Sequence, residues 1–121
     1  MSKDKEDRAY LWDMLAAART VSEFIQGKTL KDYQENLMLR SAVERQVEII
    51  GEAARKVSRS FKVENPQIPW RPIQAQRYVL AHEYGEIIAE RLWLVAFDNV
   101  PKLVNLLTPL VESPSLDDGI E

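Results

Sequence analysis

The apolar residues of this chain recur every three to four positions over most of its length, which is the spacing of helices with one buried face. The clearest stripe in the first part of the chain consists of Leu11, Met14, Leu15, Ala18, Val21 and Ile25. This stripe predicts a helix from about Asp4 to Gln26 that ends at Gly27, because glycine commonly terminates helices. No stretch alternates apolar and polar residues as a strand would. The pattern therefore predicts an all-α fold.

A second helix is expected to begin just after Thr29. Thr29 and Asp32 have the spacing of a capping box, in which two side chains bond the free backbone N–H groups of a first helical turn. The helical pattern then continues to about Phe61. This is long for one helix, so we expect a bend between Asn36 and Ser41.

Prolines divide the second half of the chain. Pro66 and Pro69 predict a loop over residues 65–69, because each lacks a backbone N–H and disfavours helical geometry in the residue before it. The next helix is expected over about 71–81, with Pro72 in its first turn. The last helix is expected over about 86–107, with a kink or break at Pro101. Together these elements predict one up-down bundle of four to five helices over residues 1–111, followed by a disordered tail over 112–121.

The predicted last helix carries more apolar surface than one bundle face requires. Between residues 87 and 97 only two positions are not apolar, which produces apolar stripes on two faces. Such a helix is either enclosed on all sides by its own bundle or covered in part by a partner. Full enclosure is difficult in so small a bundle, so the pattern favours a homodimer with Ile88, Leu92 and Trp93 in its interface.

Composition and charge narrow the chemistry. The chain has no cysteine and a single histidine, His82, which excludes thiolate metal sites, cysteine nucleophiles and histidine-based metal clusters. We expect a cytoplasmic protein without a membrane span, because the first residues are charged and no run of about 18 apolar residues occurs. The net charge is −3, but residues 51–77 carry six basic residues against two acidic ones. This basic excess is either an anion-binding surface or an ordinary solvated helix face.

Arg77 and His82 carry the most evident chemistry, at the predicted end of the helix over 71–81. In a continuous helix a separation of five residues turns two side chains about 140° apart. The two residues therefore converge only if the helix ends between them or if a second subunit completes the site. Otherwise His82 would only interact with the last carbonyls of its helix. The residues alone leave both possibilities open.

Four segments of the chain resemble the HEPN superfamily of helical domains, and its HepT-like branch in particular. The segments are Arg77-x4-His82, the "R…IIGEA" helix in residues 43–54, the "IPW" motif at 68–70 and the last helix from 91 to 103. They occur in the family's order over about residues 8 to 108. The resemblance implies a homodimeric ribonuclease toxin that works without metal or cofactor. It also implies that His82 is the general acid/base and that Arg77 binds the phosphate.

The resemblance further implies a protein partner, a minimal nucleotidyltransferase (MNT) antitoxin that transfers AMP to Tyr84 in the pattern R-x4-H-x-Y. From chemistry alone, Tyr84 could equally be an aromatic residue packed at the bundle end. Tyr78 departs from the family, which often has a small polar residue directly after the arginine. We expect Tyr78 and Arg71 to contact RNA; Tyr78 either replaces the usual polar group with its hydroxyl or stacks its ring on a base. The alternative function is a non-catalytic HEPN module that binds nucleotide, RNA or a partner protein.

Overall fold

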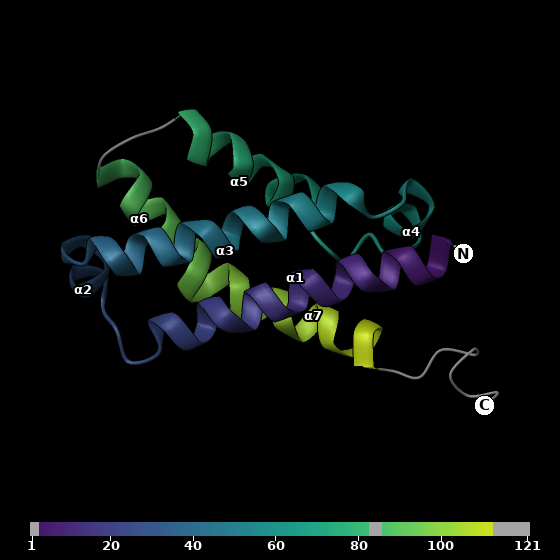
Figure 1. Cartoon of the computed structure of the whole chain (residues 1–121), viewed down its shortest axis with the longest axis horizontal. Helices are drawn as coiled ribbons and strands as arrows, with labels where there is room; N and C mark the ends of the chain where they lie inside the picture. Colours follow the sequence, from purple (N-terminus) through teal and green to yellow (C-terminus); the bar gives the residue numbers. More distant parts are fainter. Residues whose placement is uncertain (1–2, 83–85, 113–121) are drawn as a thin grey trace.

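The computed structural model describes residues 3–82 and 86–112, and the side chains at positions 3, 77–82, 86 and 87 lie outside this description. All regular structure in these ranges is helical, which confirms the predicted all-α class. The long helical segments are α1 (Lys3–Ile25), α3 (Leu37–Lys56), α5 (Trp70–His82) and the succession α6 (Glu86–Leu94), η1 (Val95–Asn99) and α7 (Val100–Glu112). Two short helices connect them, α2 (Leu30–Glu35) and α4 (Arg59–Glu64). The long segments alternate in direction along the bundle (Figure 1).

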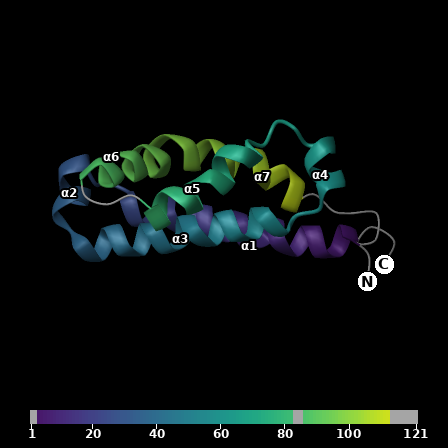
Figure 2. The ribbon, with the colours of Figure 1, turned by 90° about the horizontal axis from the view of Figure 1, so that it is seen from above.

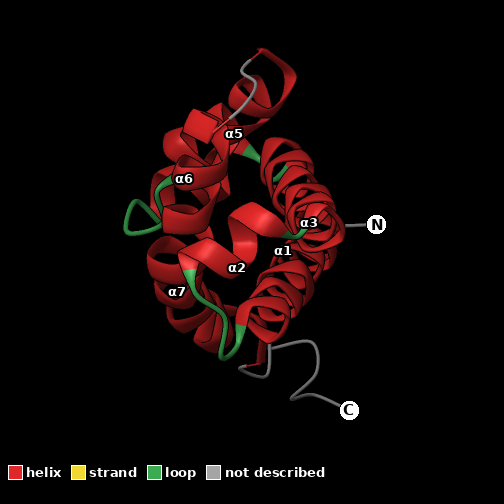
Figure 3. Cartoon of the chain, turned by 90° about the vertical axis from the view of Figure 1, so that its left-hand side faces the viewer, coloured by secondary structure: helices red, strands yellow, loops and turns green. Residues whose placement is uncertain are grey.

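Helix α1 organises the packing of the bundle. It packs against both α3 and α7, and α3 also packs against α5. In the view of Figure 2, α1 and α3 lie along one side of the molecule and α5 to α7 along the other. Helix α2 packs on α6 and lies across the end of the bundle where α6 begins (Figure 3). The predicted α1 stripe is fully buried in this core, from Leu11 to Ile25.

The turn after α1 has the predicted chemistry. Gly27 has a φ of +74°, a left-handed conformation that glycine adopts without steric cost. The Thr29 N–H donates to Asp32 Oδ2 (2.9 Å) and the Asp32 N–H donates to Thr29 Oγ1 (3.1 Å), so the capping box is confirmed. These hydrogen bonds lower the pKa of the exposed Asp32 carboxyl. The capping box thus begins α2 where the sequence predicts a helix.

The long helix predicted from Thr29 to Phe61 is wrong in its extent, because the structure divides it into three helices. The expected bend is a complete break at Asn36, whose Oδ1 accepts the Leu39 N–H (3.0 Å) and caps α3. Helix α3 ends at Lys56, and Ser58 caps a separate α4 by accepting the Phe61 N–H (3.3 Å). Both breaks occur at residues whose short polar side chains bond the backbone in place of a continuing helix. Residues 3–82 and 86–112 therefore form six helical segments rather than the predicted four to five, counting α6 to α7 as one.

The last segment bends at Pro101 without breaking. Pro101 has no N–H, and in an α-helix its ring would clash with the Phe97 carbonyl one turn earlier. The structure widens this turn into the π-helical η1, in which the Val100 N–H bonds the Val95 carbonyl. The segment then continues through Pro109 to Glu112, beyond the expected end at 107 and the expected domain boundary at 111.

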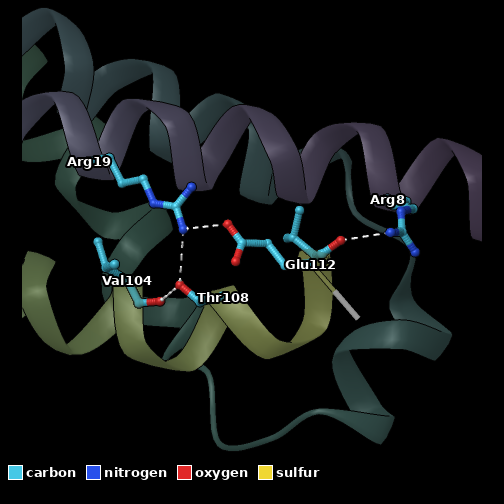
Figure 4. A network of polar contacts seen from close by, with 6 residues as sticks. Arg8, Arg19, Val104, Thr108 and Glu112 are labelled. Atoms are coloured by element: carbon cyan, nitrogen blue, oxygen red, sulfur yellow. Dashed lines mark hydrogen bonds and ion pairs between the residues drawn. The ribbon is translucent and has the colours of Figure 1, made fainter. Parts of the chain in front are cut away.

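Polar contacts fasten α7 to α1 (Figure 4). Arg8 donates to the Val111 carbonyl (2.7 Å), and Arg19 pairs with the Glu112 carboxylate (2.7 Å). The Thr108 hydroxyl donates its proton to the Val104 carbonyl (2.7 Å), a hydrogen bond within α7. These contacts explain why Glu112 belongs to the helix rather than to the tail, whose residues 113–121 lie outside those described.

The predicted dimer interface is wrong in its residues. Leu92 is fully buried, and Ile88 and Trp93 are each 8% exposed within the single chain. The apolar surface that remains outside lies at Leu94 and Phe97, which are 60% and 61% exposed. Phe97 stacks on Trp93, with ring centroids 5.5 Å apart. Most of the apolar surface of the last segment is thus buried within the single chain, and a smaller apolar surface at Leu94 and Phe97 remains exposed.

By length and composition alone, the helical segment Ile88–Glu112 meets the criteria for crossing a membrane, contrary to our expectation that none would. It does so because Asp98 and Lys102 are the only charged residues between positions 92 and 111. Core helices of soluble proteins pass the same test. In this chain one face of the segment, from Leu92 through Ala96 to Leu107, is buried in the bundle.

Asp7 provides a test of how the beginning of α1 is joined to the beginning of α4. Its carboxylate is 4% exposed and accepts hydrogen bonds from the Ser58 N–H (2.8 Å) and the Ser58 hydroxyl (2.6 Å). We predict that Asp7→Ala lowers the free energy of unfolding by about 2–3 kcal/mol, because it leaves these donors without a charged acceptor. Urea denaturation followed by circular dichroism measures the change.

The matched control is Asp13→Ala, since Asp13 is an exposed aspartate on the same helix. It should change the unfolding free energy by less than about 0.5 kcal/mol. Equal denaturation midpoints for the two variants would show that the Asp7–Ser58 contact does not stabilise the fold.

Candidate functional site

The candidate site lies on α5, whose start is fixed by the "IPW" segment. Ile68 is buried, and the Trp70 indole N–H donates to the Asn65 carbonyl (3.0 Å). The Trp70 ring packs edge-on against Phe61, with centroids 6.2 Å apart, and the Lys62 ammonium lies 5.7 Å from its centroid. Burial lowers the pKa of Lys62, and the charge of Asp7 opposes that shift. The motif therefore holds the first turn of α5 against α4.

Helix α5 is continuous from Arg77 to His82, which is its last residue. The helix therefore does not end between the two residues, and one of the two routes to their convergence is absent. Over five residues a regular helix turns them about 140° apart and separates them by about 7.5 Å along its axis. Within one chain these two positions belong to different faces of α5.

The register of α5 places the other candidate residues relative to this pair. Arg71, Ala75, Tyr78 and His82 follow one another at intervals of four, three and four, so their positions share one face. The first two of these residues are exposed. The position of Arg77 is instead two turns after the buried Trp70, on the flank of the helix that begins against the core. The two RNA contacts expected from the sequence, Arg71 and Tyr78, thus lie on the face of the histidine.

The opposite side of α5 borders an apolar groove. The groove lies between α5 and the η1–α7 segment, has a volume of about 280 Å³, and has α3 residues in its floor. Its lining includes Ile50, Pro72, Ile73, Val95 and Leu103. The side-chain oxygen of Gln76 is buried here without a hydrogen-bond partner in the described part of the chain. This side of α5 is thus apolar and partly buried, in contrast to the exposed face of Arg71 and Ala75.

A buried tyrosine between α2, α3 and α6 was not expected from the sequence. Tyr33 is fully buried, its hydroxyl has no hydrogen-bond partner among the described residues, and its ring lies 5.8 Å from that of Trp93. Burial, helped by the charge of Glu44, raises the Tyr33 pKa well above its ordinary value. Burial also raises the pKa of Glu44, while Arg40 lowers it. No motif marks these residues, because each lies in an ordinary helical pattern.

The remaining predicted features are described only in part. Arg77, Tyr78 and His82 are placed by their backbone alone, and Tyr84 lies outside the described residues. Among residues 3–82 and 86–112, no group of three or more histidine, aspartate or glutamate side chains is arranged to hold a metal ion.

Comparison with known proteins follows the same segments. The family model described as "Ribonuclease HepT-like" matches residues 14–110, from the middle of α1 almost to the end of α7. The chain is 37% identical over 103 residues to "Putative RNase MJ1380" of Methanocaldococcus jannaschii, covering 85% of this chain and 94% of the relative. It is 31% identical over 99 residues to "Probable ribonuclease HepT" of Thermococcus cleftensis, covering 82% and 90%. No solved structure matches the chain significantly.

Proposed function

Because the chain belongs to the HepT-like ribonuclease family, we propose that it is a ribonuclease toxin that cleaves RNA with Arg77 and His82. The observation that carries this proposal is that both residues lie on one continuous helix, α5. The "IPW" segment anchors the first turn of that helix. The matched relatives carry ribonuclease names, which supports RNA as the substrate class.

The proposed site is composite and needs a second copy of the chain. Since α5 is continuous, Arg77 and His82 of one chain diverge by about 140°. Two copies related by a twofold axis would place the arginine of one chain beside the histidine of the other. Each dimer then holds two equivalent Arg/His pairs in one cleft.

The proposed chemistry is attack by a ribose 2′-hydroxyl on the adjacent phosphorus. His82 takes the hydroxyl proton as the new O–P bond forms, and the protonated imidazole then gives that proton to the 5′-oxygen as its bond to phosphorus breaks. Arg77 holds the phosphoryl oxygens as charge develops on them, since its guanidinium is permanently charged and presents a planar fork of donors. The reaction proposed here requires no metal.

Control is proposed to act through Tyr84 and an MNT-type antitoxin. The phenol oxygen attacks the α-phosphorus of ATP and loses its proton to solvent, and pyrophosphate leaves with the electrons of the broken P–O bond. The attached AMP adds an anionic phosphate and a purine two residues after His82. It would repel an RNA strand by charge and exclude it by bulk.

The composite site predicts complementation between inactive variants. Arg77→Ala and His82→Ala should each lose about 10²–10⁴-fold in cleavage rate while remaining folded. Mixed under conditions of subunit exchange, the two should recover about one quarter of parental activity, because half of the dimers then hold one intact pair of two. Cleavage of labelled RNA in EDTA measures both results.

Two outcomes would contradict this site. Full activity of the double variant would place the chemistry elsewhere in the chain. Inactive mixtures that nevertheless exchange subunits would show that the arginine and histidine act within one chain.

The dimer is proposed to use the exposed apolar surface of Leu94 and Phe97. We predict that Leu94→Glu and Phe97→Glu shift the protein from dimer to monomer in light scattering at micromolar concentrations, because each buries a charge in an apolar contact. Val63→Glu is the control, since Val63 is 69% exposed on α4 and lies outside the last segment. A parental protein that is monomeric would refute the dimer.

The regulatory proposal predicts a separation of activity from control. Tyr84→Phe removes the acceptor oxygen but keeps the ring, so it should cleave RNA at the parental rate and escape the antitoxin. Mass spectrometry after co-expression with the nucleotidyltransferase should find one AMP on the parent and none on the variant. An unmodified Tyr84 in a neutralised complex would mean that the partner acts by occlusion alone.

A further inference from the structure

Helix α5 differs from the rest of the chain in its charge. The protein contains 19 acidic residues, yet none occurs between residues 65 and 82, which span the loop before α5 and the whole helix. Each of the other described helices carries at least one aspartate or glutamate. In a chain with a net charge of −3, α5 is therefore the described helix that contributes no carboxylate of its own to repel a polyanion.

Arg71, in the first turn of this helix, has a guanidinium without a partner in the described residues. Several arginines of the chain are engaged by carboxylates, for example Arg45 by Glu48 and Arg55 by Glu52. Within the part of the chain that the structure describes, Arg71 is exposed and has no hydrogen-bond or ion-pair partner. An anion that binds Arg71 therefore displaces no existing partner, and the planar donors of arginine match a phosphate.

The register connects Arg71 to the proposed catalytic histidine. Their positions lie eleven residues apart on the same face, which is about 16 Å along the helix axis. Between them lies the exposed Ala75, whose side chain is only a methyl group, so a ligand can approach the helix backbone closely there. The position of Tyr78 completes the line from Arg71 to His82.

We propose that this face of α5 is the path of the RNA strand and that Arg71 binds a backbone phosphate remote from the cleaved bond. The inference rests on the proposed function and extends it by assigning a second substrate contact. At about 3.4 Å per stacked nucleotide, 16 Å corresponds to a phosphate about five nucleotides away, or fewer where the strand is extended. The site is thus built for a polymeric strand rather than for a single nucleotide.

A contact so far from the reacting atoms binds substrate and transition state equally. Its loss should therefore raise KM and leave kcat unchanged. For a 15-nucleotide single-stranded RNA with a fluorophore and a quencher at its ends, we expect Arg71→Gln to raise KM about five- to tenfold. The KM of Arg71→Lys should lie between those of Arg71→Gln and the parent, because lysine keeps the charge without the planar fork of donors.

Binding tests the same contact without catalysis. The probe is a 2′-O-methyl strand of the same sequence, which lacks the attacking hydroxyl. The dependence of its log K on log salt concentration should become shallower by about 0.7 in Arg71→Gln, the value for one lost phosphate contact on a single strand. Thermal melting should match the parent, since Arg71 makes no contact that holds the fold within the described residues.

Arg59→Gln is the matched control, because Arg59 is also exposed and without a partner in the described residues but lies on α4. It should leave KM and the salt slope close to parental. Equal losses in both variants would show a long-range effect of charge and overturn the inference, as would a fall in kcat alone. A parental protein that binds the 2′-O-methyl strand but does not cleave RNA would refute the proposed catalysis and leave the Arg71 contact measurable; no binding at all would refute both.

Discussion

The contact between Asp7 and Ser58 joins the start of the chain to the segment that positions the candidate site. Asp7 lies near the beginning of α1, and its two hydrogen bonds hold the residue that caps α4. Helix α4 in turn supplies Phe61 and Lys62 to the indole of Trp70, the first residue of α5. The first turn of α5 is therefore linked, through α4, to a carboxylate more than sixty residues earlier in the chain, while the body of the helix packs against α3.

The continuity of α5 determines what one chain can do alone. A helix that ended after Arg77 would free the histidine to fold back toward the arginine, whereas the helix observed ends at His82. Helical geometry then separates the two residues in angle whatever their rotamers. For the two residues to act on one phosphodiester, a second copy is the simplest source of the missing partner. The proposed dimer is thus supported by backbone geometry, independently of any apolar surface.

Much of the fold was accessible from the sequence because its signals are local. Gly27, Thr29 with Asp32, and the prolines of the loop over 65–69 each act within one turn, and each is found where expected. The errors arose where a local signal competes with a long pattern. Asn36 and Ser58 interrupt an apolar stripe that reads as one helix. Leu92 lies on α6, which packs against α2 and α3, and no periodicity reports how completely neighbouring helices enclose it.

The uneven charge of the chain also connects the proposed activity with its proposed control. Residues 78–121 carry two basic residues against eight acidic ones, so α5 is a carboxylate-free helix followed by an acidic segment. On the proposed path, added negative charge near His82 would repel an RNA strand that runs along α5. In the sequence, Tyr84 follows His82 by two residues. A single AMP there would place a phosphate at the terminus of the path that begins at Arg71. One modification would thereby oppose the strand electrostatically without disturbing the contacts that hold the bundle together.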